Sequence, residues 1–168
     1  MSDNQTRSDL IDRVHHEHEH LCRLFDDLHE RFEKIAAGEF EDQSRDEIVE
    51  MAAEDLAVAL DEMLHHFNQE EEIFFVDIET RFPELGAEVA RLVEAHETMC
   101  ERTRWLQQQF KKNAATLAVN VEPILEVLRG MKELVRQHTV EEQKLFDVVL
   151  SRIPPAERII LLREMQSI

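Results

Sequence analysis

Four long stretches of the chain place apolar residues at steps of three and four, the spacing that puts side chains on one face of an α-helix. The stretches cover residues 11–35, 49–73, 85–110 and 121–149. A helix that is apolar along one face needs other helices to cover that face. The sequence therefore predicts an all-α protein, with one domain over residues 1–168 that folds as an up-down-up-down four-helix bundle.

Residues that begin and end helices stand at the borders of these stretches. Gly38 follows the first stretch, where a C-terminal glycine is expected. Ser44 precedes the second stretch and has Glu47 three positions later, which is the pattern of a capping box. We expect residues 38–45 and 111–120 to connect consecutive helices.

A short fifth helix is predicted near the C-terminus, after the sequence "IPPAE". It should run from about Ala156 to Met165 and cover the end of the bundle with Ile159, Ile160 and Leu162. Three Gly, four Pro and no Tyr in the whole chain also argue against a β-sandwich or barrel.

Polar residues interrupt each apolar stretch, and apart from Thr103 all of them are metal-binding types. They are His18, His66, Glu70, His96, His138 and Glu142. A single histidine on an apolar face is usually a core residue with a hydrogen bond. Buried carboxylates need a partner or a metal, and six such residues in register on four helices favour one shared site over a structural bundle with unrelated polar groups.

The stretch "VHHEHEHL" contains four histidines, and helical geometry separates them. At about 100° per residue, His18 lies on the apolar face, while His16 and His20 lie on the opposite face. His15 lies near the edge of the apolar face. The same test applied to "LHHF" selects His66 over its neighbour.

The ligand pattern occurs twice along the chain. Each half supplies one His and then a His-x-x-x-Glu pair, and residues four apart share a helix face. Two metal ions follow from this arrangement, with four imidazoles as terminal ligands, two carboxylates as bridges and open coordination positions. Imidazole and carboxylate together suit Fe, Mn or Zn, and we expect iron.

These residues resemble the hemerythrin family, also called the HHE cation-binding domain. The matching pieces are "EHEHLCRLFDDL", "HHFNQEEEIF", "AHETM" and "HTVEEQKLF", within about residues 8–150. The resemblance implies a non-heme di-iron centre that is bridged by carboxylates and by an oxo or hydroxo group. His18 and His66 would bind one iron, His96 and His138 the other, and Glu70 and Glu142 would bridge the two.

The family resemblance also implies a function, which is to bind or sense O2, NO or peroxide, with consumption of peroxide or NO as a further activity. One residue departs from the O2 carriers of the family, because Cys100 stands four positions after His96 where they have a second histidine. Stable O2 carriage is therefore not expected. The alternative is a non-catalytic metal-binding or iron-donating protein, similar to iron-centre repair proteins.

Two other motifs in the sequence match known metal-site patterns only in part. "HEHEH" matches the zinc-protease pattern His-Glu-x-x-His, but His16 and His20 would face solvent, a position that favours adventitious binding of zinc or nickel. Glu62 and His65 match half of the ferritin signature, and the other half is missing.

Cys22 and Cys100 each follow a proposed ligand by four residues, so they are either buried apolar residues or thiols that respond to the redox state of the site.

The charge of the chain limits its partners. A formal net charge of −18 disfavours nucleic acid and anionic membranes, which leaves a small molecule as the expected partner. The N-terminal segment "MSDNQTRSDLID" lacks the features of a signal peptide, and no run of about 18 apolar residues exists. We therefore expect a cytoplasmic protein with reduced cysteines.

Overall fold

The computed structural model describes three parts of the chain, residues 3–39, 44–112 and 120–166. In these ranges the side chains of residues 3–15, 17, 162, 163, 165 and 166 lie outside the description. Every regular element in the described residues is helical, so the predicted all-α class is confirmed. The predicted connections 38–45 and 111–120 fall largely in the two gaps.

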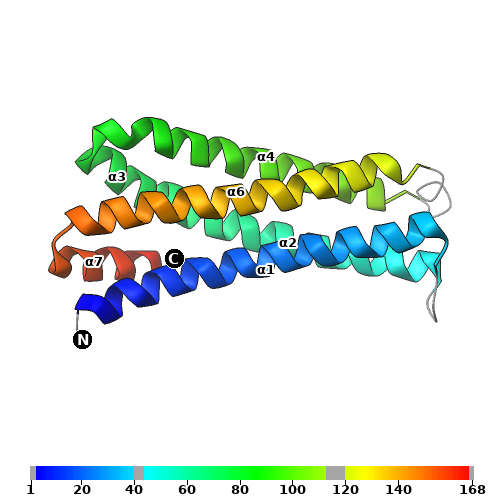
Figure 1. Ribbon diagram of the computed structural model, residues 1–168, viewed down its shortest axis with the longest axis horizontal. Coiled ribbons are helices and arrows are strands. Elements are labelled where there is room, and N and C mark those ends of the chain that lie inside the picture. Colours follow the sequence, from blue (N-terminus) through cyan, green and yellow to red (C-terminus); the bar gives the residue numbers. More distant parts are fainter. Residues whose placement is uncertain (1–2, 40–43, 113–119, 167–168) are drawn as a thin grey trace.

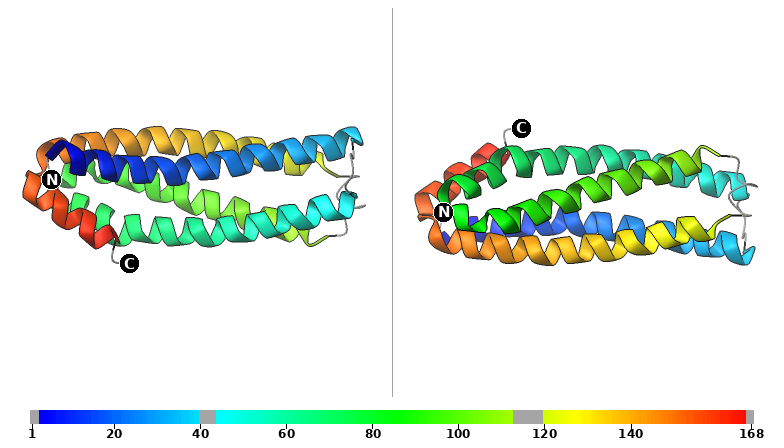
Figure 2. Two further views of the ribbon diagram at one scale, coloured as in Figure 1. Left: turned by 90° about the horizontal axis from the view of Figure 1, so that it is seen from below. Right: turned by 90° about the horizontal axis from the view of Figure 1, so that it is seen from above.

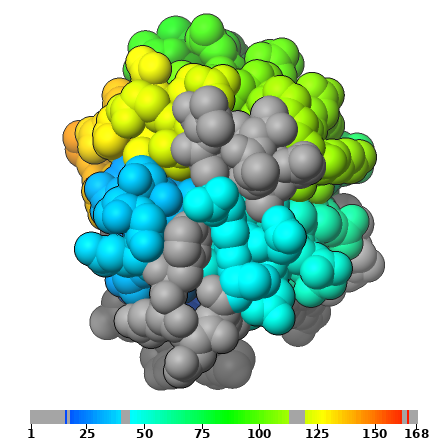
Figure 3. All heavy atoms as spheres, turned by 90° about the vertical axis from the view of Figure 1, so that its right-hand side faces the viewer, coloured from blue at the N-terminus to red at the C-terminus, as the bar shows by residue number. Residues whose placement is uncertain are grey.

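Four long helices make up most of the structure, and each runs opposite to the previous one in Figure 1. They are α1 (Asp3–Ala37), α2 (Arg45–Gln69), α4 (Gly86–Phe110) and α6 (Glu122–Arg152). α1 packs mainly on α6, and α2 packs mainly on α4. Seen from the end in Figure 3, α6 and α4 lie side by side above α1 and α2, so the four helices enclose one interior.

The ends of α1 and α2 follow the predicted signals. α1 ends at Ala37, and Gly38 has a φ of 72°, a conformation that glycine adopts without strain. The Ser44 hydroxyl accepts a hydrogen bond from the backbone N–H of Glu47 at 3.3 Å, and the Glu47 carboxylate accepts one from the backbone N–H of Ser44 at 2.8 Å. The predicted capping box is therefore confirmed.

The helix after α2 is less regular than the sequence predicts. A π-helix, η1 (Glu70–Phe75), follows α2 directly and leads into α3 (Val76–Arg81) and a 3-10 turn, η2 (Pro83–Leu85). A π turn is wider than an α turn because its hydrogen bonds close over five residues, and such turns occur often at functional sites. Ile73, expected in the apolar stripe, is only partly buried, while Phe74 and Phe75 are buried.

The fifth predicted helix is present as α7 (Pro155–Gln166), and it lies at the end of the bundle where the N-terminus also lies (Figure 2). Its predicted packing is wrong at one position. Ile160 is 55% exposed, and Leu161 is the residue that is buried, at 5% exposure. Ile159 is half-buried, and the side chain of Leu162 lies outside the described residues. The error arises because α7 has no clear apolar face in its sequence.

Two apolar clusters fill the interior, one towards each end of the bundle. The turn-end cluster is built from all four long helices and includes Phe25, Leu28, Phe32, Leu56, Leu106 and Leu128. The α7-end cluster includes Phe74, Phe75, Ile78, Leu92, Phe146 and Leu161. The polar residues singled out in the sequence lie between them. None of the described helices has the length and hydropathy to cross a membrane.

Candidate metal centre

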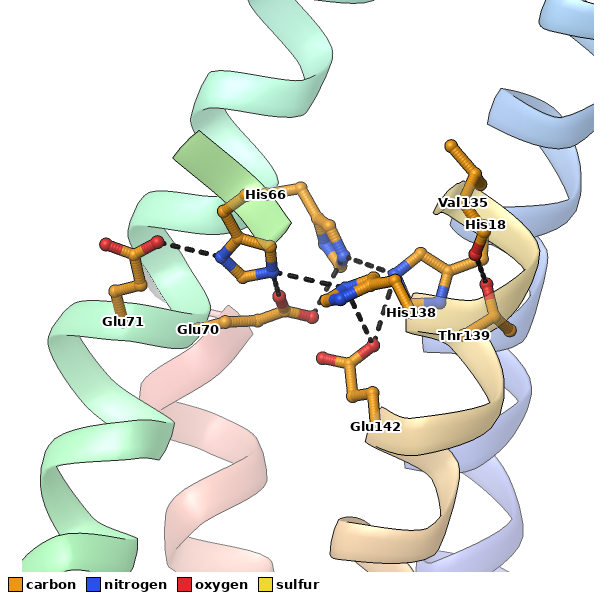
Figure 4. Close-up of polar contacts among 9 residues, drawn as sticks. His18, His66, Glu70, Glu71, Val135, His138, Thr139 and Glu142 are labelled. Carbon is orange, nitrogen blue, oxygen red and sulfur yellow. Dashed lines mark hydrogen bonds and ion pairs between the residues drawn. The ribbon is translucent and has the colours of Figure 1, made fainter. Parts of the chain in front are cut away.

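The six polar residues that interrupt the apolar stretches meet in one layer between the two apolar clusters. Figure 4 shows this layer and labels all of them except His96. They come from all four long helices and η1, as His18 in α1, His66 in α2, Glu70 in η1, His96 in α4, and His138 and Glu142 in α6. All six are buried, with exposed fractions between 0% and 7%. The structure thus brings every predicted site residue together, while their role as metal ligands stays a prediction.

The orientation of the histidines in "VHHEHEHL" agrees with the helical geometry. His18 is 1% exposed, whereas His16 and His20 are exposed. The side chain of His15 lies outside the described residues, so its predicted place at the edge of the apolar face is not tested. His66 is buried and its neighbour in the chain is exposed, also as predicted.

The four buried imidazoles form two pairs. In the first pair, the Nε2 atoms of His18 and His66 lie 3.2 Å apart. In the second pair, the Nε2 atoms of His96 and His138 also lie 3.2 Å apart. Each pair joins neighbouring helices, and all four imidazoles present the same ring nitrogen to the interior of the layer.

The two carboxylates connect these pairs. Glu70 lies 2.9 Å from His66 through Oε1 and 3.3 Å from His96 through Oε2, measured to Nε2 in each case. Glu142 Oε2 lies 3.2 Å from the Nε2 atom of His18 and 3.6 Å from that of His138. Each carboxylate therefore touches one imidazole of each pair.

Three overlapping groups in this layer have donor atoms close enough to hold a metal ion. In each group the donor atoms lie within 4.8 Å of one another. The groups are His18, His66 and Glu70; His18, His138 and Glu142; and Glu70, His96 and His138. Every two of these groups have one residue in common. Two ions bound in two of the groups would therefore share a ligand.

The chemistry of Glu70 tests whether a cation fits this layer. Its side chain is fully buried, and no well-aligned hydrogen bond reaches either oxygen from the described residues. Burial acts to raise the pKa of Glu70, but the charge of His66 and the short contacts of His66 and His96 hold it well below its usual range. Glu70 is thus a buried anion that faces imidazole nitrogens, and a metal cation fits such a position.

The second pair is enclosed by aromatic rings and by a further carboxylate. The Phe67 ring stacks on His96 with centroids 3.8 Å apart, and the Phe75 ring lies 5.8 Å from it on centroids. Glu71 Oε1 lies 2.7 Å from His96 Nδ1 and accepts a hydrogen bond from it. This contact turns the Nε2 lone pair of His96 inward, as outer carboxylates do for histidine ligands of metals.

The two imidazoles of the second pair have opposite pKa shifts. Burial acts to lower the pKa of His96, but Glu70 and Glu71 raise it above its usual value. Burial lowers the pKa of His138 to about 2, and the other imidazoles add to this effect. His138 is therefore a neutral imidazole with a lone pair, the form that binds metal.

Glu71 is the functional candidate that sequence reasoning missed. Its only signal was the second Glu in "HHFNQEEEIF", which belongs to the family motif but does not indicate a contact. Glu71 and His96 are 25 positions apart, so the contact depends on how η1 and α4 are rotated towards each other.

The first pair, in contrast, borders a surface pocket of about 360 Å³. The pocket is lined by His16, His20, Leu21, Glu62, Met63, His65 and His66. His66 thus belongs both to the buried layer and to the wall of the pocket, so the layer can be approached from solvent on this side.

The cysteines lie near the layer but outside the three candidate groups found in the described residues. Cys100 is 6% exposed and Cys22 is half-buried. Burial raises the pKa of both thiols, so they are protonated at neutral pH. Cys100 is thus placed outside the groups of donor atoms that could hold a metal ion in the part of the chain that the structure describes.

The protein is a helical bundle whose interior contains groups of histidine and glutamate that could hold a metal ion. This combination is that of a metal-binding helical protein. The family model of the hemerythrin HHE cation-binding domain matches residues 9–149, and this chain belongs to that family. The resemblance seen in the sequence is confirmed. Searches of curated proteins and of solved structures gave no match.

Proposed function

We propose that the protein holds two iron ions in the buried layer and binds or senses O2, NO or peroxide there. The main support is the arrangement of the two carboxylates, each of which touches one imidazole from each pair. His18 and His66 would hold one ion, and His96 and His138 the other. When bound, the ions supply open coordination positions and electrons for a small oxidant.

The protein side chains supply charge and exclude water. Glu70 and Glu142 place two fully buried carboxylates among the four imidazoles, in a layer between two apolar clusters. Mixed nitrogen and oxygen donors without thiolate suit iron. Six donors for two ions leave positions that the chain does not fill, which favours binding of an external molecule over a purely structural role.

Access to the layer is proposed to occur at the first pair. The pocket reaches His66 there, while the rings of Phe67 and Phe75 cover His96 on the other side. Because Cys100 belongs to none of the three candidate groups in the described residues, we do not expect a further ligand on α4 to close the site. This open arrangement favours turnover or sensing over stable O2 storage.

The test is the metal content together with an optical spectrum. Protein loaded with Fe(II) without oxygen should contain two iron ions per chain and change its visible absorption in air. A content of one ion or none after loading would refute the two-ion centre. Loading with Mn or Zn in parallel shows which cation is retained against a chelator.

An iron-donating role is the second candidate, and the formal charge of −18 favours it because an acidic surface attracts cations. The two roles differ in what happens to added peroxide and to bound iron. A catalyst should consume peroxide in steady state and keep its iron. A donor should lose iron to a weak chelator at a rate faster than it consumes peroxide.

A further inference from the structure

A second set of metal-binding side chains lies outside the buried layer, on the wall of the surface pocket. It consists of His16 and His20 from α1 and Glu62 and His65 from α2. All four are exposed. His16 and His20 are four residues apart, and Glu62 and His65 are three apart, so each pair shares one face of its helix.

The four side chains line one pocket, and a contact joins the two helices there. His20 Nε2 lies 3.5 Å from Glu62 Oε2, which joins α1 to α2. His65 Nε2 lies 3.2 Å from the side-chain nitrogen of Gln69, one turn further along α2. Leu21, which is buried, lines the same pocket.

The pocket also contains one imidazole of the buried layer. His65 and His66 are consecutive in α2, and both line the pocket. His65 is exposed, whereas His66 is 7% exposed and contacts His18 and Glu70. A cation bound at the outer residues would therefore lie in the same pocket as a residue of the buried layer.

We propose that His16, His20, Glu62 and His65 form a peripheral capture site for a divalent transition-metal cation, which then passes through the pocket to the buried layer. Three imidazoles and one carboxylate suit Fe²⁺, Co²⁺, Ni²⁺ or Zn²⁺ better than Mg²⁺ or Ca²⁺, which prefer oxygen ligands. The passage to the layer rests on the proposed function, but cation capture at the pocket does not.

The exposure of the four residues suits capture and release rather than permanent binding. Exposed side chains lose rotational freedom when they gather around an ion, and this entropy cost weakens the binding. The acidic surface raises the local cation concentration, and the imidazoles select transition metals from it. The buried layer holds its donors in place already, so it binds the ion more tightly.

The test compares the triple variant His16→Gln/His20→Gln/Glu62→Gln with a matched control, Asp61→Asn. The control removes the same charge from the neighbouring exposed residue, which does not line the pocket. Metal-free wild type and variants are mixed with Co²⁺ at low micromolar concentration without oxygen, and uptake is followed by visible absorption. Equilibrium dialysis gives the number of ions bound per chain.

During dialysis against Co²⁺, wild type should bind a weakly held peripheral ion in addition to the two ions of the buried layer, and the triple variant should lack this additional ion. We expect the triple variant to fill the buried layer about tenfold more slowly, at the lower end of the effect of local charge on association rates. Its final occupancy of the buried layer should equal that of wild type, and Asp61→Asn should match wild type in both measurements. An unchanged uptake rate in the triple variant would overturn the proposal, even if the peripheral ion is lost.

Failure of the proposed function gives a different result from failure of the capture site. A wild type whose buried layer takes up no cation would refute the proposed function and the passage. The capture site is then tested alone in the Glu70→Leu variant, by NMR of the His16 and His20 imidazoles. Broadening of these signals by Co²⁺ would support the capture site. Absence of broadening at these signals would refute it.

Discussion

The two imidazole pairs have the same ligand atoms but different surroundings. The first pair borders a pocket, and His66 forms part of the pocket wall. The second pair is covered by the stacked ring of Phe67, and His96 is held by Glu71. A sequence pattern that occurs twice thus produces two unequal half-sites, because the residues around the ligands differ.

The difference predicts separate roles for the two halves. Cations and small molecules should arrive at the first pair, which is the side open to solvent. The second pair should keep its ion longer, because its imidazoles are oriented by a carboxylate and shielded from water. Four predictions test this comparison.

Glu70→Leu should have the largest effect, because Glu70 is the carboxylate whose two oxygens contact different pairs. Both ions lose a ligand, so metal content should fall from two ions per chain to less than one. The metal-free variant should also be less stable than wild type by about 3–5 kcal/mol, because the buried imidazoles that face Glu70 lose their counter-charge. Metal analysis and urea unfolding measure both quantities.

Thr103→Val is the control for this variant. Thr103 is also fully buried and polar, but its hydroxyl donates to the backbone oxygen of Met99 and contacts none of the six predicted ligands. Its metal content should equal that of wild type. Retention of two ions by Glu70→Leu would show that the carboxylate does not join the half-sites.

Phe67→Ala should remove the cover of the second pair and make the two halves alike. The change should lower the free energy of unfolding by about 3–5 kcal/mol, as expected for loss of a buried ring. Metal loss to a chelator should change from two phases to one fast phase. Phe32→Ala is the matched control, because Phe32 is equally buried but stacks on Phe110 in the turn-end cluster.

Phe32→Ala should destabilise the protein by a similar amount and keep two phases of metal loss. If both variants lose metal in the same way, the effect is one of stability and not of local cover.

Glu71→Gln should weaken the second pair alone. The amide can still accept a hydrogen bond from His96 but carries no charge, so affinity for the ion at the second pair should fall about 10- to 100-fold. Stepwise competition with a chelator should show that one ion is bound more weakly than in wild type and that the other is bound with unchanged affinity. Glu72→Gln, at an exposed neighbouring position, should leave both affinities unchanged.

The metal-free protein should have its maximum stability near pH 6.5, because the two imidazoles of the second pair respond in opposite directions. The pKa of His96 is higher in the folded protein than in the unfolded chain, where it is about 6.5. The protonated imidazole therefore stabilises the folded state at a pH below about 6.5, and this stabilisation is lost as the pH rises through the pKa of His96 in the folded protein.

The lowered pKa of His138, about 2, has the reverse effect. Below about pH 6.5 the unfolded chain binds a proton at this residue and the folded chain does not, so stability should fall by about 1.4 kcal/mol per pH unit. Urea unfolding at pH 5.5, 6.5 and 8 measures the profile. His138→Leu should flatten the acid side, and an unchanged slope would contradict this assignment.

Helical periodicity explains why the buried positions of the six residues could be predicted. Residues such as His18 and His138 share a face with apolar neighbours, and that face must turn inward whatever the rest of the fold does. The hydrogen bond between Glu71 and His96 could not be predicted in this way. It depends on the relative rotation of two helices and on a π turn that has no distinct signal in composition.

The pocket and the packing of α7 could not be predicted from the sequence either. A pocket forms where neighbouring side chains fail to fill space, which is a property of three-dimensional packing. In α7 the apolar residues Ile159, Ile160 and Leu161 are consecutive, so periodicity does not show which of them is buried. The structure places Leu161 inward and leaves Ile160 exposed.

The position of the polar layer between two apolar clusters has a consequence for how the protein is made. Each cluster holds the helices together on its own side of the layer, so the chain can finish folding before any cation arrives. Newly synthesised protein would then wait in a folded state during metal shortage. The fraction of molecules that carry metal would report the supply of cations to the cell and not the efficiency of folding.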